Sequence, residues 1–220
     1  MRRAKNKFLL AREGLPFVLI SWAALFLVML LGWIYLYVPL FFCSLLTTWF
    51  FRDPERYFEG ESKYILAPAD GKIVELTTSQ NPFEGNCNSM YRISIFMSIF
   101  DVHVNRAPFA GIVEEIRYSE GKFLSAHLEK SYLENEKNWI TIKTHFGEKL
   151  YLTQIAGIIA RRISCWVRKG KEVERGERIG MIRFGSRVDL YLPQKVKLMV
   201  TKGKRVKAGK SILAYWEEEV

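Results

Sequence analysis

The 220-residue sequence predicts a mainly β domain that follows an apolar, helical N-terminal segment. Two observations carry this prediction. Residues 14–51 contain no charged side chain, whereas residues 63–220 contain short runs in which apolar and polar residues alternate, with Gly and Asn turns between them. Alternation with a period of two is typical of strands with one buried face, and short strands separated by turns are typical of sandwiches and barrels.

The apolar segment at residues 14–51 predicts a membrane anchor. It follows a basic segment, residues 1–13, and it lacks the small-residue cleavage site of a secretory signal. As one helix its 38 residues would span about 57 Å, nearly twice the hydrocarbon thickness of about 30 Å. We therefore expect a helical hairpin that is broken near Gly32 or Pro39. A single pass with an interfacial helix is the alternative.

Charge indicates how the anchor is oriented and what it binds. A hairpin places the basic N-terminus and the charged residues 52–56 on one side, which the positive-inside rule assigns to the cytoplasm. The net charge of +10 favours an anionic bilayer surface, and the sequence has no arginine-rich run or nucleic-acid-binding motif. We expect a cell-membrane protein with its domain on the cytoplasmic face and no nucleic acid as partner.

The composition changes at Asp53-Pro54, so we expect a linker at residues 52–62 and the β domain at residues 63–220. Three cysteines without a Cys-x-x-Cys pair indicate neither a disulfide framework nor a zinc site, and we expect no metal site. Within the β domain only residues 123–137 are expected to be helical or irregular. The first strand-like runs are residues 71–76, 91–96, 111–116, 139–143 and 149–155.

The C-terminal third contains an internal repeat. Residues 169–179 and 202–212 share Lys, Gly, Lys, Val, Gly and Ile at a constant offset. A glycine turn, a lone inward Val, a second glycine turn and then a strand resemble the hammerhead units of lipoyl- and biotinyl-type folds. Two such units suggest two sheets folded over one another in pseudo-symmetry. The predicted architecture is therefore a lipoyl/biotinyl-like hammerhead barrel-sandwich.

The run at residues 181–193 alternates as a strand does, but Gly185-Ser186 interrupts it near its middle. A Gly inside a strand marks a bulge or a close approach of another group to the backbone. Two interpretations are open at this point. One is a bulge followed by a surface serine, and the other is that the Ser186 hydroxyl attacks the Gly185 carbonyl and cuts the chain.

Three other polar residues could carry chemistry. Asp70 is followed by glycine, and Asp-Gly is a favoured turn pair. On a strand, Asp101 and His103 would point to the same face, where a carboxylate can orient an imidazole base. A structural hydrogen-bonded pair is the alternative. The sequence has no zincin, P-loop or hydrolase-elbow pattern.

Three segments together resemble the phosphatidylserine decarboxylase family, in its short bacterial and archaeal form. They are Ala67-Pro68-Ala69-Asp70-Gly71, Phe100-Asp101-Val102-His103-Val104-Asn105-Arg106-Ala107-Pro108 and Phe184-Gly185-Ser186-Arg187-Val188-Asp189. The resemblance runs from the membrane segment to the C-terminus, and the segments follow the family's order. Each segment alone is a weak signal, but the three together are specific.

The resemblance implies a pyruvoyl-dependent carboxy-lyase that is made as a proenzyme. Self-cleavage between Gly185 and Ser186 would give a β chain, residues 1–185, and an α chain, residues 186–220. The two chains would form a heterodimer, and whether heterodimers assemble into a higher oligomer is left open. Ser186 would become the pyruvoyl group. That group forms a Schiff base with phosphatidylserine and withdraws electrons while carbon dioxide leaves, which gives phosphatidylethanolamine.

The resemblance also implies roles for individual residues. Asp70 and Asp101 match carboxylates associated with self-cleavage, and His103 matches a histidine used as acid and base. The longer bacterial enzymes have a second histidine where this chain has Arg106, and Leu-Gly-Ser-Thr where it has Phe-Gly-Ser-Arg. Arg106 and Arg187 are candidates for holding the lipid phosphate or carboxylate. Whether His103 or Asp70 is the base for self-cleavage stays open.

Three other functions remain to be separated from this one. An archaetidylserine decarboxylase would use the same mechanism on an ether-linked lipid. A non-enzymatic, membrane-anchored hammerhead adaptor explains the repeat and the anchor but not Gly185-Ser186. A serine hydrolase with Ser186 as a lasting nucleophile would require an intact chain and lacks a nucleophile elbow.

Overall fold

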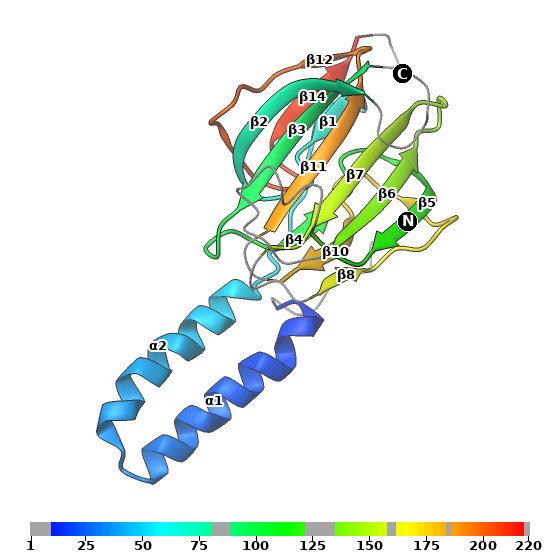
Figure 1. Cartoon of the computed structure of the whole chain (residues 1–220). Coiled ribbons are helices and arrows are strands. Elements are labelled where there is room, and N and C mark those ends of the chain that lie inside the picture. The colour runs from blue at the N-terminus through cyan, green and yellow to red at the C-terminus, as the bar shows by residue number, and fades with distance from the viewer. Residues whose placement is uncertain (1–9, 81–88, 122–134, 158–161, 184–185, 218–220) are drawn as a thin grey trace. The chain divides into compact units, whose positions relative to one another are not determined.

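The structure, a computed structural model, describes residues 10–80, 89–121, 135–157, 162–183 and 186–217. The chain divides into two compact units, Met1–Glu55 and Arg56–Val220. The first unit is helical and the second is built of strands (Figure 1). The division lies within the predicted linker, residues 52–62.

The helical unit contains a short 3-10 turn, η1 (Arg12–Gly14), and two helices, α1 (Leu15–Leu30) and α2 (Ile34–Phe50). Gly32 lies between the helices with φ +69°, a left-handed conformation that a glycine adopts without a Cβ clash. Of the two predicted break positions, the structure uses Gly32. Pro39 lies inside α2, which continues through it.

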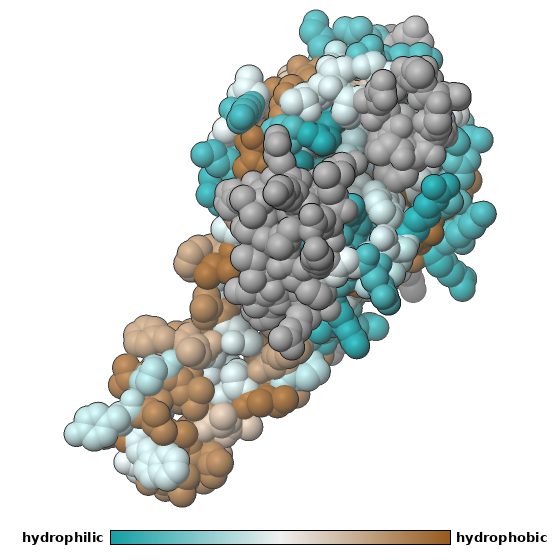
Figure 2. Space-filling model, in the orientation of Figure 1, coloured by the Kyte–Doolittle hydropathy of each residue, from teal (hydrophilic) through white to brown (hydrophobic). Residues whose placement is uncertain are grey.

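Polar contacts join the two helices along their packed sides. The Trp22 indole N–H donates to Thr48 Oγ1 at 3.0 Å, and the Ser44 hydroxyl lies 3.1 Å from the Ser21 carbonyl oxygen. The outward side chains are apolar and exposed, as the visible surface of this unit shows (Figure 2). Arg12–Leu30 is long and apolar enough to cross a membrane, and α2 is a shorter apolar helix. The unit therefore has the composition of a membrane-associated hairpin.

The second unit is mainly β, with one curled antiparallel sheet of eight strands and two sheets of three strands (Figure 1). Its strands are β1 (Tyr64–Leu66), β2 (Gly71–Gln80), β3 (Ser89–Met97), β4 (Val104–Arg106), β5 (Gly111–Ser119), β6 (Lys137–Lys143), β7 (Lys149–Ile155), β8 (Ile163–Cys165), β9 (Glu172–Val173), β10 (Arg178–Ile182), β11 (Ser186–Pro193), β12 (Val196–Leu198), β13 (Arg205–Val206) and β14 (Ile212–Trp216). Each of the five strand-like runs that the sequence predicts lies within one of these strands.

The strand order shows that this unit is built of two similar halves. In the large sheet the order is β13-β2-β3-β11-β7-β6-β5-β9, and the small sheets are β1-β14-β12 and β4-β10-β8. We call β4 to β10 the continuous half. We call β1 to β3 together with β11 to β14 the split half, because the continuous half is inserted between β3 and β11.

Matching hydrogen bonds support the relation between the halves. The Gly209 amide donates to the Ala67 carbonyl at 2.9 Å, and the Gly176 amide donates to the Ala107 carbonyl at 2.8 Å. The two small sheets also match, since β14 lies between β1 and β12 as β10 lies between β4 and β8. The repeat found at residues 169–179 and 202–212 is thus part of a structural similarity that extends over both halves.

The core lies on the face of the large sheet to which Val188, Leu190 and Leu192 of β11 point. Arg187, Asp189 and Tyr191 alternate with them and therefore point to the other face. Ser186 has the parity of Val188 and lies on the core face. The predicted alternation is correct for this strand.

The prediction of a single strand across residues 181–193 is wrong. Met181 and Ile182 belong to β10 in a small sheet, whereas Ser186 begins β11 in the large sheet. The chain therefore passes from one sheet to another between residues 182 and 186, and the interruption in the sequence is not a bulge. Apolar alternation cannot distinguish these cases, because β10 and β11 both contribute buried side chains to the same core.

Candidate active site

Ser186 is fully buried at the first position of β11. There it pairs with Met97, the last residue of β3, and its hydroxyl donates to the Met97 sulfur at 3.4 Å. Phe184 and Gly185 lie outside the residues that the structure describes. Of the two interpretations of Gly185-Ser186, the one with a surface serine is wrong, because the Ser186 side chain is buried on the core side of the sheet.

Three buried amides lead away from this serine. The Asn105 amide nitrogen lies 3.7 Å from the Met97 sulfur, and Asn105 Oδ1 accepts a hydrogen bond from Gln154 Nε2 at 2.8 Å. Gln154 Oε1 in turn accepts from Asn138 Nδ2 at 2.8 Å. We call Asn138, Gln154 and Asn105 the amide chain. The sequence did not lead us to predict this amide chain, although Gln154 shares the parity of Leu150 and Leu152, which marks an inward polar residue.

His103 is fully buried beside β10. Its carbonyl oxygen accepts a bond from the Ile182 amide at 3.3 Å, so its backbone continues the pairing of β4 with β10. The ring Nδ1 lies 3.0 Å from the backbone oxygen of Asp101. A carbonyl oxygen can only accept, so the proton is assigned to Nδ1 and the basic nitrogen of the neutral ring is Nε2.

The Asp101 carboxylate does not form the predicted pair with the His103 ring. It accepts from the Ser98 amide at 2.9 Å and the Ser98 hydroxyl at 2.7 Å, and it binds Arg205 at 2.7 Å. The prediction of a shared strand face is wrong because β4 begins at Val104 and Asp101 lies at the end of a turn. Asp101 still reaches His103, but through its backbone.

Asp70 is buried directly before β2. Both of its carboxylate oxygens bind the Arg56 guanidinium, with 2.8 Å between Arg56 Nη2 and Asp70 Oδ2. Asp70 also accepts from the Ala208 amide at 2.7 Å. The Asp70 carboxylate thus joins the start of the β unit to the second copy of the internal repeat, residues 202–212.

Arg106 is buried at the end of β4, near the same loop. It donates to the Gly176 carbonyl at 3.0 Å, and a Cβ added to Gly209 would lie 2.9 Å from Arg106 Cδ. Asp70 and Arg106 therefore both contact the glycine turns at Gly176 and Gly209 or the residues beside them. Glycine at position 209 leaves room for the arginine.

Arg187 points away from Ser186, because successive strand residues face opposite sides. It binds Asp189 at 2.6 Å and 3.1 Å, Ser94 at 2.7 Å and Glu75 at 3.1 Å. Burial raises the pKa of the Asp189 carboxyl above its ordinary value, and the Arg187 guanidinium opposes this shift. The lipid-binding role expected of Arg187 stays a prediction, and these contacts instead suit a structural ion pair.

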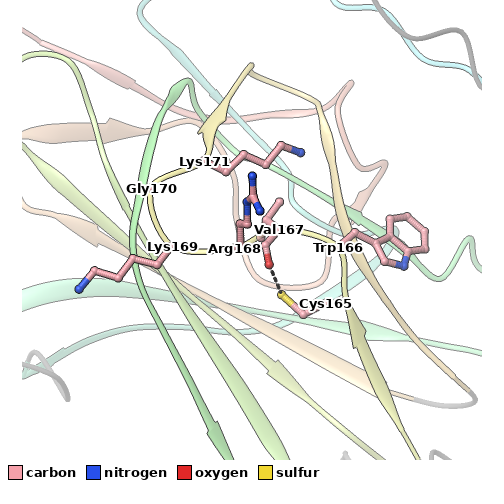
Figure 3. Close-up of a pocket in the computed structure, with 7 residues that line it drawn as sticks. All are labelled: Cys165, Trp166, Val167, Arg168, Lys169, Gly170 and Lys171. Carbon is pink, nitrogen blue, oxygen red and sulfur yellow. Dashed lines mark hydrogen bonds between the residues drawn. The ribbon is translucent and has the colours of Figure 1, made fainter.

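A separate open hollow lies over the loop Cys165–Lys171 (Figure 3). Its lining includes Arg168, Lys169 and Lys171, and Lys171 binds Glu177 at 2.6 Å. None of the predicted site residues lines it, so we do not assign the reaction to it. Within the described ranges no group of three or more His, Cys, Asp or Glu side chains is placed to hold a metal ion.

Comparison with known proteins decides the family. The phosphatidylserine decarboxylase family model matches residues 43–214. A phosphatidylserine decarboxylase proenzyme of Syntrophus aciditrophicus (strain SB) is 45% identical over 210 residues, which cover 95% of this chain and 98% of the relative. The proenzymes of Burkholderia pseudomallei (strain 1106a) and Burkholderia cenocepacia (strain HI2424) are 41% and 40% identical, each with 96% of this chain and 97% of the relative covered.

The chain belongs to the phosphatidylserine decarboxylase family. The resemblance first seen at residues 67–71, 100–108 and 184–189 is therefore confirmed. All three segments lie within the matched residues, and the similarity to the relatives extends over nearly the whole chain.

Proposed function

We propose that this protein is a phosphatidylserine decarboxylase, a carboxy-lyase that is made as a proenzyme and cleaves itself between Gly185 and Ser186. The observation that carries the proposal is the position of Ser186. The serine lies buried at the point where the chain enters the large sheet, in a protein whose full-length relatives are named phosphatidylserine decarboxylase proenzymes.

The proposed cleavage uses only atoms of the chain. Ser186 Oγ forms a bond to the Gly185 carbonyl carbon, and the amide C–N bond breaks, so the hydroxyl proton passes to a base and the nitrogen gains a proton. Loss of the Ser186 Cα proton then breaks the Cβ–Oγ bond and releases the Gly185 carboxylate. The resulting dehydroalanine takes up water and loses ammonia, which leaves a pyruvoyl group at residue 186. Gly185 suits the first step because it has no Cβ to restrict the backbone.

The surroundings of residue 186 fit a small ketone. The Met97 sulfur supplies an apolar wall, and the Asn105 amide supplies a hydrogen-bond donor beside it. The pyruvoyl group would supply the electron-withdrawing carbonyl on which decarboxylation depends. A buried site also keeps water from competing with the substrate amine.

The described contacts favour His103 as the acid and base of the reaction. Its Nδ1 is held by the Asp101 carbonyl, which leaves Nε2 to take or give a proton. Asp70 lies in a bidentate pair with Arg56, so we assign it the task of holding residues 207–209 against the start of β2. Asp101 would orient His103 through its backbone.

The fold suggests how the cleaved chains stay together. After cleavage the α chain, residues 186–220, would still contain β11 to β14, and these strands pair with β1, β2, β3 and β7 of the β chain. The matched glycine loops and the two-halved strand order support a lipoyl/biotinyl-like hammerhead barrel-sandwich. The apolar hairpin, residues 14–51, would anchor the domain at the cytoplasmic face, where its lipid substrate lies.

A decarboxylation assay tests the proposal. The purified protein is given vesicles that contain diacyl phosphatidylserine, or its ether-linked archaeal analogue, and carbon dioxide and the aminoethyl lipid are measured. We expect turnover of the diacyl lipid by the wild-type protein. Turnover of the ether-linked lipid alone would identify an archaetidylserine decarboxylase. Lack of turnover of both lipids by a membrane-bound, folded protein would contradict the proposal and favour an adaptor.

A further inference from the structure

The fold itself does not explain why the amide chain of Asn138, Gln154 and Asn105 is buried. All three residues are at most 2% exposed. Burying an amide costs free energy unless its hydrogen bonds are made inside the protein. The chain makes these bonds in sequence, and it ends at the sulfur that also receives the Ser186 hydroxyl.

The matching positions of the split half show which side chains the fold needs where no amide chain is present. Asn105 lies in β4 opposite Gly180, and the matching residue of β1 is Ile65, which lies opposite Ala214. In the large sheet Leu152 pairs with Leu190, which are matching positions of β7 and β11. Two residues further along each strand are Gln154 and Leu192.

Ile65 and Leu192 are fully buried, as are their amide counterparts. The split half therefore fills these two positions with aliphatic side chains. The same architecture folds there without amides, so packing does not explain Asn105 and Gln154. At these two positions the amides stand in the continuous half, where Asn105 contacts the sulfur that also receives the Ser186 hydroxyl.

The contact at the sulfur explains what the amides can do. A thioether is a weak acceptor, and here it receives both the Ser186 hydroxyl and the Asn105 amide. A weak acceptor can hold the hydroxyl in one rotamer without competing strongly for its proton. The oxygen lone pairs then stay available for attack. Met97 can do this only if its own side chain is fixed, and Asn105, held by Gln154, contacts it.

We propose that the amide chain and Met97 position the Ser186 hydroxyl for self-cleavage. Asn105, Gln154 and Asn138 are positioning residues that act through the Met97 sulfur, with an influence that falls with distance from it. The inference rests on the proposed cleavage at Gly185-Ser186 and adds the residues that prepare the serine. It requires no cofactor, because it concerns the chain before it is cut.

The test measures the rate at which freshly made proenzyme is cleaved, by denaturing mass spectrometry over time, together with the thermal unfolding midpoint of each full-length variant. We expect Met97→Leu to slow cleavage by about 30-fold and Asn105→Leu by about tenfold, because small displacements of a reacting group cost up to about 100-fold. Gln154→Leu should slow cleavage less than Asn105→Leu does, and Asn138→Leu should slow it by less than about threefold.

A matched control separates positioning from stability. Asn135 is a buried amide that does not belong to the amide chain of Asn138, Gln154 and Asn105. Its Nδ2 donates to the Ala156 carbonyl at 2.7 Å. Asn135→Leu should lower the unfolding midpoint about as much as Asn105→Leu but leave the cleavage rate within about twofold of wild type. Met97→Leu keeps the side-chain volume, so it remains informative if an amide variant does not fold.

A double-mutant cycle supplies the decisive readout. If Asn105 acts through Met97, the variant with both changes is cleaved no more slowly than the slower single variant. The proposal would be overturned if the two changes slowed cleavage by factors that multiply in the double variant. It would also be overturned if Asn105→Leu and Met97→Leu were cleaved as fast as Asn135→Leu. Failure of the wild-type chain to cleave at all would instead overturn the proposed function, so the two failures are distinguishable.

Discussion

The split half and the continuous half share strand order and loop hydrogen bonds, but they differ where the candidate site lies. Asp70 of the split half corresponds to Ala110, since Gly71 and Gly111 both begin the second strand of their halves and pair with Val206 and Val173. Arg106 of the continuous half corresponds to Leu66, and both residues end the first strand of their halves. The fold accepts an apolar residue at each position, so the charged residues need another explanation.

The cleavage segment has a counterpart as well. Phe146-Gly147-Glu148 precedes β7, as Phe184-Gly185-Ser186 leads into β11. In the continuous half the segment is a tight turn, with Gly147 at φ +94° and the Thr144 amide donating to the Glu148 carbonyl at 2.8 Å. In the split half, the whole continuous half lies between β3 and β11. The segment of the continuous half closes a hairpin, whereas the matching segment of the split half lies between β10 and β11 in the sequence and contains a serine.

The largest expected effect comes from removing the serine hydroxyl. Ser186→Ala should abolish cleavage and leave the whole 25.7 kDa chain, because no other atom can form the ester. Denaturing mass spectrometry measures this. Glu148→Ala, the same type of change at the matching position, should be cleaved at the wild-type rate. A cut Ser186→Ala chain would show that the two segments do not differ in the way proposed.

Giving the split half the alanine of its counterpart should have the next largest effect. Asp70→Ala leaves the buried Arg56 guanidinium without its carboxylate, and breaking a buried ion pair in this way costs about 3–5 kcal/mol of unfolding free energy. Chemical denaturation measures the loss. Cleavage should also slow, because the Ala208 amide loses the carboxylate that holds residues 207–209 in place.

A second variant distinguishes the ion pair from a chemical role. Arg56→Met with Asp70→Ala removes both charges and should recover most of the stability. If cleavage recovers as well, Asp70 only supports the fold. If cleavage stays slow in a stable protein, the Asp70 carboxylate itself contributes to the reaction.

A smaller effect is expected at Arg106. Arg106→Leu, which copies Leu66, should raise the KM for phosphatidylserine about tenfold and change kcat by less than about threefold if the guanidinium holds the lipid phosphate or carboxylate. Steady-state kinetics on vesicles measure both constants. Arg175→Leu is the control, because Arg175 also donates to backbone carbonyls, among them that of Gly60 at 2.9 Å. An unchanged KM would assign Arg106 to the fold.

The smallest effect is expected when the counterpart receives a serine. Glu148→Ser should change the unfolding free energy by less than about 0.5 kcal/mol, because Glu148 is partly exposed and its ion pair with Lys195 lies at the surface. No fragment starting at position 148 should form, since the amide chain and Met97 are absent there. Such a fragment would show that a Gly-Ser turn alone is sufficient for cleavage.

Much of the fold could be predicted from the sequence because period-two alternation reports directly on burial. The predicted runs that lie in β2, β3, β5, β6 and β7 follow that rule, and the repeat in residues 169–179 and 202–212 indicates one part of the similarity between the halves. The rest of the similarity between the halves could not be predicted, because core positions accept any aliphatic residue of suitable size, so two halves can share a strand order without sharing a sequence.

The candidate site was predicted in part. The motif residues Asp70, His103 and Ser186 were named, but the pairing of the Asp101 carboxylate with His103 was not correct, because a turn at residues 98–101 replaces the expected strand. The sheet change between residues 182 and 186 could not be seen either, since alternation does not report which sheet a residue joins. Gln154 could have been found from its inward parity beside Leu150 and Leu152.

We propose that the chain is cut where the split half resumes after the continuous half, between Gly185 and Ser186. Denaturing mass spectrometry of the purified wild-type protein tests it most directly. The account predicts two fragments, residues 1–185 and a fragment that starts at residue 186 without an α-amine and resists Edman sequencing. An intact 220-residue chain from a preparation that decarboxylates phosphatidylserine would contradict it.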